Sequence, residues 1–194
     1  GKQVDYQDIY TEGITKITKT DIEYAKVLHA SIKLLGTSKW EDDGKIYSMV
    51  APFMIDSDHP LGHVNGVFNG IFVNGNMLGD TMFYGKGAGK LPTASAVVAD
   101  VVDAVKHQGT NIMTIWEQDK VELGDRANFA CRFFVRVADT TSKETIEKVF
   151  GEVEYVTLAD VSGEYAFLTE KLTEGAFEEK SKQVDMIMRI RTAL

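Results

Sequence analysis

The sequence predicts an α+β fold, in which a mixed or antiparallel sheet with helices is followed by a βαββαβ ferredoxin-like module. Apolar residues change along the chain from strand-like alternation to helical spacing. Eight of the 17 glycines fall between positions 62 and 89. The order β-α-β-β-α-β is expected over residues 125–194 and is that of a ferredoxin-like module. We place the boundary near residues 108–125 and expect domains at 1–112 and 113–194.

The first domain is expected to contain a helix, an antiparallel sheet and a second helix. Thr20 to Glu23 has the residue types of a capping box. Strands are predicted at 31–40, 45–54, 67–73 and 77–84, with turns at 41–44 and at Asn74-Gly75. A helix is predicted from Thr93 because six apolar residues share one face: Ala94, Val97, Val98, Val101, Val102 and Val105.

The second domain is expected to alternate strands and helices. Predicted strands cover 128–139, 152–160, 163–170 and 191–194, and predicted helices cover 142–150 and 176–190. This is the pattern that predicts the ferredoxin-like module.

Charge and cysteine content exclude several classes of protein. The 194 residues include 21 Lys and Arg and 29 Asp and Glu, which gives a net charge of −8. An acidic chain is a poor partner for nucleic acid or for an anionic membrane. The single cysteine, Cys131, cannot form an internal disulfide, which favours a reducing, cytoplasmic environment. No apolar run reaches the length of a membrane span.

A glycine-rich segment, Gly85 to Thr93, is the most conspicuous candidate site. It follows a predicted strand and precedes a predicted helix, where backbone amides can approach an anion. A Walker A loop would need residues other than Tyr84 and Leu91 at those positions, and a dinucleotide fingerprint would need a residue other than Lys90. Phosphate binding is therefore disfavoured. From spacing alone, a structural turn and contact with a ligand both remain open.

The other chemistry-bearing residues favour structural roles. His59 and His63 flank a proline and a glycine, which indicates a turn rather than a metal site. Cys131 alternates with apolar residues in a predicted strand and is expected to be a small buried hydrophobe. From the residues alone we predict no catalytic residue and no metal site.

Several segments together resemble homoserine dehydrogenase. They are Tyr10–Ile14, the helix after Thr20, 32–36, His59–Leu61 and above all YGKGAGKLPTASAVVAD at 84–100. The similarity runs from about residue 8 to about residue 105. It implies an oxidoreductase that interconverts aspartate 4-semialdehyde and L-homoserine with NADPH or NADH, in threonine, methionine and isoleucine biosynthesis. It assigns 1–112 to the C-terminal part of the family's catalytic and dimerisation domain.

The resemblance also implies where a cofactor binds. It assigns the nicotinamide side of NADP or NAD to Gly85, Gly87, Ala88, Gly89 and Thr93, because glycines let a backbone approach a flat ring and amides at a helix start are free donors. The family's Rossmann domain and catalytic lysine would precede this chain, so we expect these 194 residues alone to be inactive.

The resemblance further implies a homodimer and a regulatory tail. The sheet from Ser31 to Tyr84 is expected to supply the dimer surface, and 113–194 is expected to be an ACT-like regulatory domain. Its turn Asp139–Ser142 has neither proline nor glycine, which argues against L-threonine as an effector; Asp139 is instead expected to cap the helix beginning near Ser142. The alternative function is a non-catalytic module for amino-acid binding and dimerisation.

Overall fold

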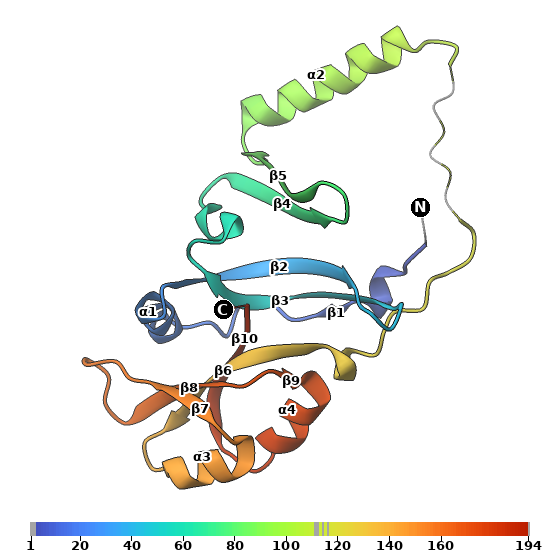
Figure 1. Cartoon of the computed structure of the whole chain (residues 1–194). Coiled ribbons are helices and arrows are strands. Elements are labelled where there is room, and N and C mark those ends of the chain that lie inside the picture. Colours follow the sequence, from blue (N-terminus) through green and yellow to red (C-terminus); the bar gives the residue numbers. More distant parts are fainter. Residues whose placement is uncertain (1–2, 111–112, 114, 116, 194) are drawn as a thin grey trace. The chain divides into compact units, whose positions relative to one another are not determined.

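The computed structural model describes residues 3–110, 113, 115 and 117–193, and they form two compact units (Figure 1). We call Asp58–Glu117 the hairpin–helix unit. We call residues 3–57 together with 118–193 the sheet unit.

The sheet unit is built from two separate stretches of the chain. Its strands are β1 (Tyr10–Thr11), β2 (Ala30–Trp40), β3 (Ile46–Asp56), β6 (Ala130–Ala138), β7 (Val153–Val156), β8 (Glu164–Thr169), β9 (Leu172–Thr173) and β10 (Met186–Ala193). Its helices are α1 (Lys19–Val27), α3 (Lys143–Phe150) and α4 (Glu174–Ser181), with short 3-10 turns η1 (Tyr6–Asp8) and η3 (Arg126–Asn128).

The hairpin–helix unit is simpler. A 3-10 turn η2 (Pro60–His63) leads into the hairpin β4 (Phe68–Gly75) and β5 (Gly79–Lys86), and α2 (Lys90–Lys106) follows. None of the helices in the described ranges is both long enough and apolar enough to cross a membrane.

The sheet of the larger unit confirms the predicted order β-α-β-β-α-β. Strands β10, β6, β8 and β7 lie side by side in that order and all their pairings are antiparallel. The sheet continues beyond β10, because Arg191 to Ala193 pair in parallel with Phe53 to Ile55 of β3. Strands β1 and β2 also pair with β3, and β9 pairs with β6. The first and last thirds of the chain thus share one sheet.

The two faces of β6 bury different helices because side chains alternate along a strand. Phe133 stacks on Phe177 of α4 with ring centroids 4.0 Å apart, and this face also carries Ile146 of α3. Phe134 points the other way, with its ring centroid 5.4 Å from that of Tyr24 in α1. The sheet is therefore covered by α3 and α4 on one face and by α1 on the other.

The start of α1 differs from the prediction. The helix begins two residues earlier than a Thr20 cap requires, since Thr18 and Asp21 form the capping box. Asp21 accepts a hydrogen bond from the Thr18 amide at 2.7 Å and is fully buried. Ile22 is 46% exposed, and Tyr24 and Ala25 are the residues of this helix that pack into the core.

Three other boundaries were wrong. Asn74 and Gly75 pair with Asp80 and Gly79, so the hairpin turn is at 76–78. Helix α2 begins at Lys90, three residues before Thr93, because Gly89 in a left-handed conformation (φ +122°) ends the extended backbone. The helix expected over 176–190 ends at Ser181, since the alternating residues from Met186 onward pair with β6 as strand β10.

Two further expectations are corrected. Strands between Ser31 and Tyr84 form two sheets rather than one: β2 and β3 join the eight-stranded sheet, and β4 and β5 pair with each other in a separate two-stranded sheet. Helix α3 is capped by Ser142, whose hydroxyl accepts from the Thr145 amide at 3.2 Å, and not by Asp139.

The predicted domains 1–112 and 113–194 remain a prediction. The compact units divide the chain differently, because the pairing of β3 with β10 places both ends of the chain in the sheet unit. The predicted boundary at 108–125 lies partly outside the described residues.

Candidate functional site

The glycine-rich segment connects β5 to α2. The Gly87 amide donates to the Val67 carbonyl at 3.2 Å, which continues the hairpin ladder by one residue. Gly89 occupies the N-cap position with φ +122°, a conformation that favours glycine. The chain thus passes from strand to helix within three residues.

The first turn of α2 presents uncommitted backbone donors. The Thr93 amide and hydroxyl both donate to the Gly89 carbonyl, at 3.1 and 2.9 Å. Pro92 has no N–H group. The amides of Lys90 and Leu91 have no acceptor among the described residues. Free amides at a helix start attract electronegative groups.

The glycines of the segment differ in how much room a side chain would have. A Cβ on Gly85 would meet no atom within 4 Å, whereas one on Gly87 would lie 1.5 Å from Nδ2 of Asn69. A methyl group on Gly87 would therefore force the Asn69 side chain to move, whereas Gly85 leaves open space. The five residues assigned by resemblance lie together on this short exposed segment: Gly85, Gly87, Ala88, Gly89 and Thr93.

The histidine pair forms the predicted turn. His59 caps η2, and its Nδ1 accepts from the Leu61 amide at 3.1 Å. Its ring also lies 4.8 Å from that of Phe72, centroid to centroid. Across the described ranges, no three His, Cys, Asp or Glu side chains gather as metal ligands would.

Cys131 is buried in β6, as predicted. Its side chain belongs to the apolar cluster beneath α3 and α4. Burial raises the pKa of its thiol to about 12, so the thiol is neutral at physiological pH. A neutral, covered thiol cannot serve as a nucleophile.

Buried charge is what sequence reasoning missed. Arg191 is fully buried in β10 and donates to Glu174 and, at 2.7 Å, to Glu12. Arg126 donates to Glu174 at 2.8 Å. Burial by itself would lower the pKa of Arg191, but the hydrogen bonds to Glu174 and Glu12 outweigh it and raise the pKa. Glu12 thereby ties the segment before α1 to the last strand.

A second buried arginine, Arg136 of β6, ties α1 to the sheet in the same way. Arg136 of β6 donates to Asp21 at 2.7 Å and to both oxygens of Glu164, at 2.9 and 2.6 Å. A signal for both clusters was present: arginines interrupt otherwise apolar strand patterns at 132, 136, 189 and 191. Charged residues within an apolar strand need buried partners.

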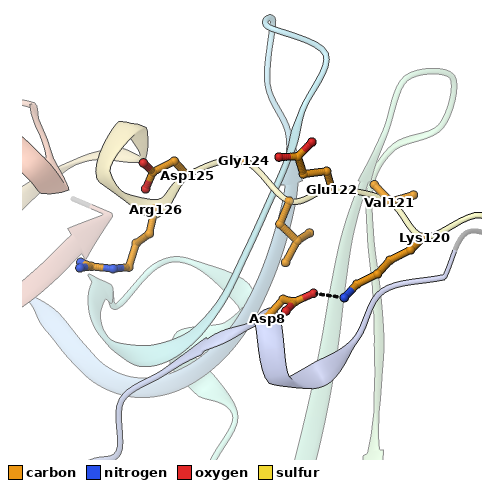
Figure 2. A pocket seen from close by; sticks show the side chains of 8 residues that line it. Asp8, Lys120, Val121, Glu122, Gly124, Asp125 and Arg126 are labelled. Carbon is orange, nitrogen blue, oxygen red and sulfur yellow. Dashed lines mark ion pairs between the residues drawn. The ribbon is translucent and has the colours of Figure 1, made fainter.

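A pocket of about 510 Å³ lies beside η1 and η3 (Figure 2). Asp8 and Lys120 point toward one another across it and form an ion pair at 2.6 Å. Asp125 caps η3 by accepting from the Ala127 amide at 2.9 Å, and Arg126 turns to Glu174 and Glu178. Asp8, Lys120 and Arg126 are thus engaged in ion pairs and Asp125 in a cap, which leaves the exposed Glu122 as the lining carboxylate without a hydrogen bond or ion pair among the described residues.

Comparison with known proteins relates the chain to one family. The sequence profile described as homoserine dehydrogenase matches residues 1–102, more than half of the chain. The Pseudomonas aeruginosa homoserine dehydrogenase is 45% identical over 106 residues, which are 55% of this chain and 24% of that protein. The Helicobacter pylori homoserine dehydrogenase is 34% identical over 149 residues, 77% of this chain and 35% of that protein.

Solved structures extend the likeness to nearly all of the chain. A homoserine dehydrogenase from Thiobacillus denitrificans matches with a TM-score of 0.79 and 25% identity, over 97% of this chain and 48% of that one. The S. aureus homoserine dehydrogenase at pH 6.0 matches with a TM-score of 0.70 and 30% identity, over the same shares. The chain thus spans a quarter to a half of the length of these relatives. It belongs to the homoserine dehydrogenase family.

Proposed function

We propose that this chain forms part of a homoserine dehydrogenase that interconverts aspartate 4-semialdehyde and L-homoserine with NADPH or NADH. The observation that carries the proposal is the family match over residues 1–102, which includes the whole glycine-rich segment and most of α2. The threonine, methionine and isoleucine pathways and a cytoplasmic location belong to the same proposal; the buried free thiol of Cys131 supports a reducing compartment.

The glycine-rich segment fits the edge of a nicotinamide cofactor. Its residues are exposed, Gly85 has open space where a Cβ would stand, and the Lys90 and Leu91 amides have no acceptor in the described part. When bound, the nicotinamide supplies or accepts the hydride. In this proposal Gly85, Gly87, Ala88 and Gly89 let the backbone come close, and Thr93 holds the Gly89 carbonyl away from the ligand.

A pair of glycine variants tests the cofactor contact in the assembled enzyme. Gly85→Ala adds a methyl group into open space, so folding should be unaffected while the KM for the cofactor rises about tenfold through steric exclusion. Gly36→Ala in β2 is the matched control, since its Cβ meets only Val50 at 3.9 Å. Equal KM values for wild type and Gly85→Ala would remove the segment from the cofactor site.

A second experiment tests whether activity needs residues beyond these 194. The 194 residues contain neither a dinucleotide fingerprint nor the family's catalytic lysine segment. We expect no NADP-dependent oxidation of homoserine by the chain alone, and activity when it is joined to the N-terminal half of the Pseudomonas aeruginosa relative. Turnover by the isolated chain would contradict this assignment.

A homodimer is part of the proposal. Strands β4 and β5 carry exposed apolar side chains, including Ile71 and Phe83 at 64% and 63% exposure, and such surfaces mark interaction sites. Light scattering after size exclusion should give twice 21.5 kDa at micromolar concentration. Ile71→Lys should shift the molecule to monomer, whereas Lys45→Gln in the loop after β2 should not.

We propose a second function for residues 113–194, as an ACT-like module for amino-acid binding and dimerisation, with L-threonine as its effector. The antiparallel order β10, β6, β8, β7 favours it. The turn after β6 is closed by Thr141 donating to Ala138 and Asp139 donating to Gly163, each at 3.0 Å. Calorimetry with L-threonine, and with homoserine and methionine as controls, tests it: saturable heat for threonine alone supports an effector site, and no heat from folded protein contradicts it.

A further inference from the structure

A second pocket lies in the sheet unit, where the segment between β1 and α1 passes the start of β10. Its volume is about 550 Å³, which is within the range of small-molecule sites. The lining residues used below are Glu12, Lys16, Arg136, Met186, Met188 and Arg189. None of them belongs to the glycine-rich segment, so the inference does not depend on the proposed enzymatic function.

The two arginines of this pocket differ in the number of hydrogen bonds that their guanidinium groups donate. Arg136 donates four hydrogen bonds, which go to Asp21, Glu164 and Thr18. Arg189 donates one hydrogen bond, from Nη2 to Glu12 at 3.1 Å. Its Nη1 is buried and has no acceptor among the described residues. A buried donor without a partner is rare. Because Nη1 has almost no accessible surface, a ligand in the pocket would reach it through a small movement of the Arg189 side chain, which is 23% exposed.

The charge around Arg189 is also incompletely neutralised. The same Oε2 of Glu12 accepts from Arg191 at 2.7 Å and from Tyr10 at 3.1 Å, so its negative charge is shared. Lys16 lines the pocket with an exposed ammonium group, and the described part of the chain offers it no ion pair. Besides the paired Arg136, the lining thus holds two cations, Arg189 and Lys16, and one carboxylate, Glu12, which already serves another arginine.

The remaining lining residues are Thr18 and three apolar residues. Met186 and Met188 are half-buried and Ile187 is 49% exposed, all at the start of β10. Methionine side chains adapt to ligands of varied shape. The pocket thus combines a cationic end with a hydrocarbon wall.

We propose that this pocket binds a small aliphatic carboxylate. The guanidinium of Arg189 and the ammonium of Lys16 hold the carboxylate oxygens, and the methionines cover the hydrocarbon body. Arginine is suited to planar, bidentate recognition of a carboxylate. Inorganic phosphate fits less well, because its second negative charge would approach Glu12 and its surface makes no use of the apolar wall.

Solution NMR of the full 194-residue chain tests the proposal with butyrate as the probe. Butyrate should shift the Arg189 Nε–Hε signal and the Met186 and Met188 methyl signals in a saturable manner, and n-butylammonium should not. Phosphate binding more tightly than butyrate would overturn the aliphatic assignment in favour of a simple anion site. No saturable shift with butyrate would overturn the proposal entirely.

Variants assign the binding to these residues. Arg189→Met should raise the dissociation constant for butyrate about tenfold, and Lys16→Met about threefold. Lys148→Met, on the exposed face of α3, is the matched control and should leave binding unchanged. If Arg189→Met fails to fold, the exposed Lys16 decides the outcome. Wild-type affinity in every folded variant would contradict the assignment.

Discussion

The hairpin–helix unit and the sheet unit use apolar residues in opposite ways. In the sheet unit, β6 buries its side chains on both faces, with Phe133, Phe134 and Val135 fully covered. In the hairpin–helix unit, α2 has no buried residue, and Val101 on its apolar face is 57% exposed. The same helical periodicity that normally indicates a core face therefore marks a surface that the hairpin–helix unit does not cover by itself.

The two units also differ in where their distinctive residues lie. The sheet unit buries Arg136 and Arg191 against carboxylates from distant segments. The glycine-rich segment, which is the most specific motif of the sequence, is instead exposed in the hairpin–helix unit. We infer that the sheet unit carries the stability of the chain, and that the exposed apolar side chains of the hairpin–helix unit are where association is to be sought.

The largest expected effect tests the buried charge of the sheet unit. Arg191→Met leaves Glu174, which is 1% exposed, without its main partner, so the free energy of unfolding should fall by about 3–5 kcal/mol. Lys182→Met removes an exposed ion pair with Glu179 and should change it by less than about 1 kcal/mol. Urea unfolding measures both. Equal effects would show that the buried cluster adds nothing to stability.

Thiol reactivity compares the units directly. At pH 8 the native Cys131, with its pKa raised to about 12 by burial, should be alkylated about 10³-fold more slowly than a cysteine introduced on α2 by Val101→Cys. The reason is the smaller thiolate fraction, with burial slowing access further. Mass spectrometry after iodoacetamide separates the two sites. Similar rates would mean that β6 opens readily or that α2 is covered in solution.

A matched pair of substitutions tests packing. Val135→Thr places a hydroxyl in the fully buried face beneath α3 and α4 and should cost about 1–3 kcal/mol. Val101→Thr on exposed α2 should remain within about 0.5 kcal/mol. Thermal unfolding followed by circular dichroism measures the difference. A large loss for Val101→Thr would show that α2 packs against a partner.

The smallest expected effect concerns pH. Burial would raise the pKa of Glu12, but the hydrogen bond from Arg191 and the charges of Arg189 and Arg191 lower it below its ordinary 4.5. A lowered native pKa stabilises the fold above pH 4.5, and this contribution is lost as the pH falls through the native pKa. The stability gap between wild type and Glu12→Gln should shrink over that interval in urea titrations. A gap independent of pH would contradict the ion pairs of Glu12.

Local patterns predicted the elements well where one face is plainly apolar. Alternation along 128–139 predicted β6, and the hydrophobic period from Lys143 to Phe150 predicted α3. The Thr20 capping box was wrong, because Thr18 and Thr20 have equivalent chemistry and the choice is made by Asp21, which Arg136 holds from a distant strand. The continuation of α4 to Ile190 was wrong because Met186 to Ile190 suit either helix or strand until β6 offers partners.

The sequence by itself determined the α+β class, the βαββαβ order, the turn at Gly44 and the glycine-rich segment before α2. These depend on residues near one another in the chain, whose preferences are local. Only the tertiary structure decided that β3 pairs with β10, that Glu12 reaches Arg191, and that Arg189 and Lys16 share a pocket. Such contacts join segments far apart in sequence, and they form because a buried charge and an unpaired strand edge both need partners that no local pattern specifies.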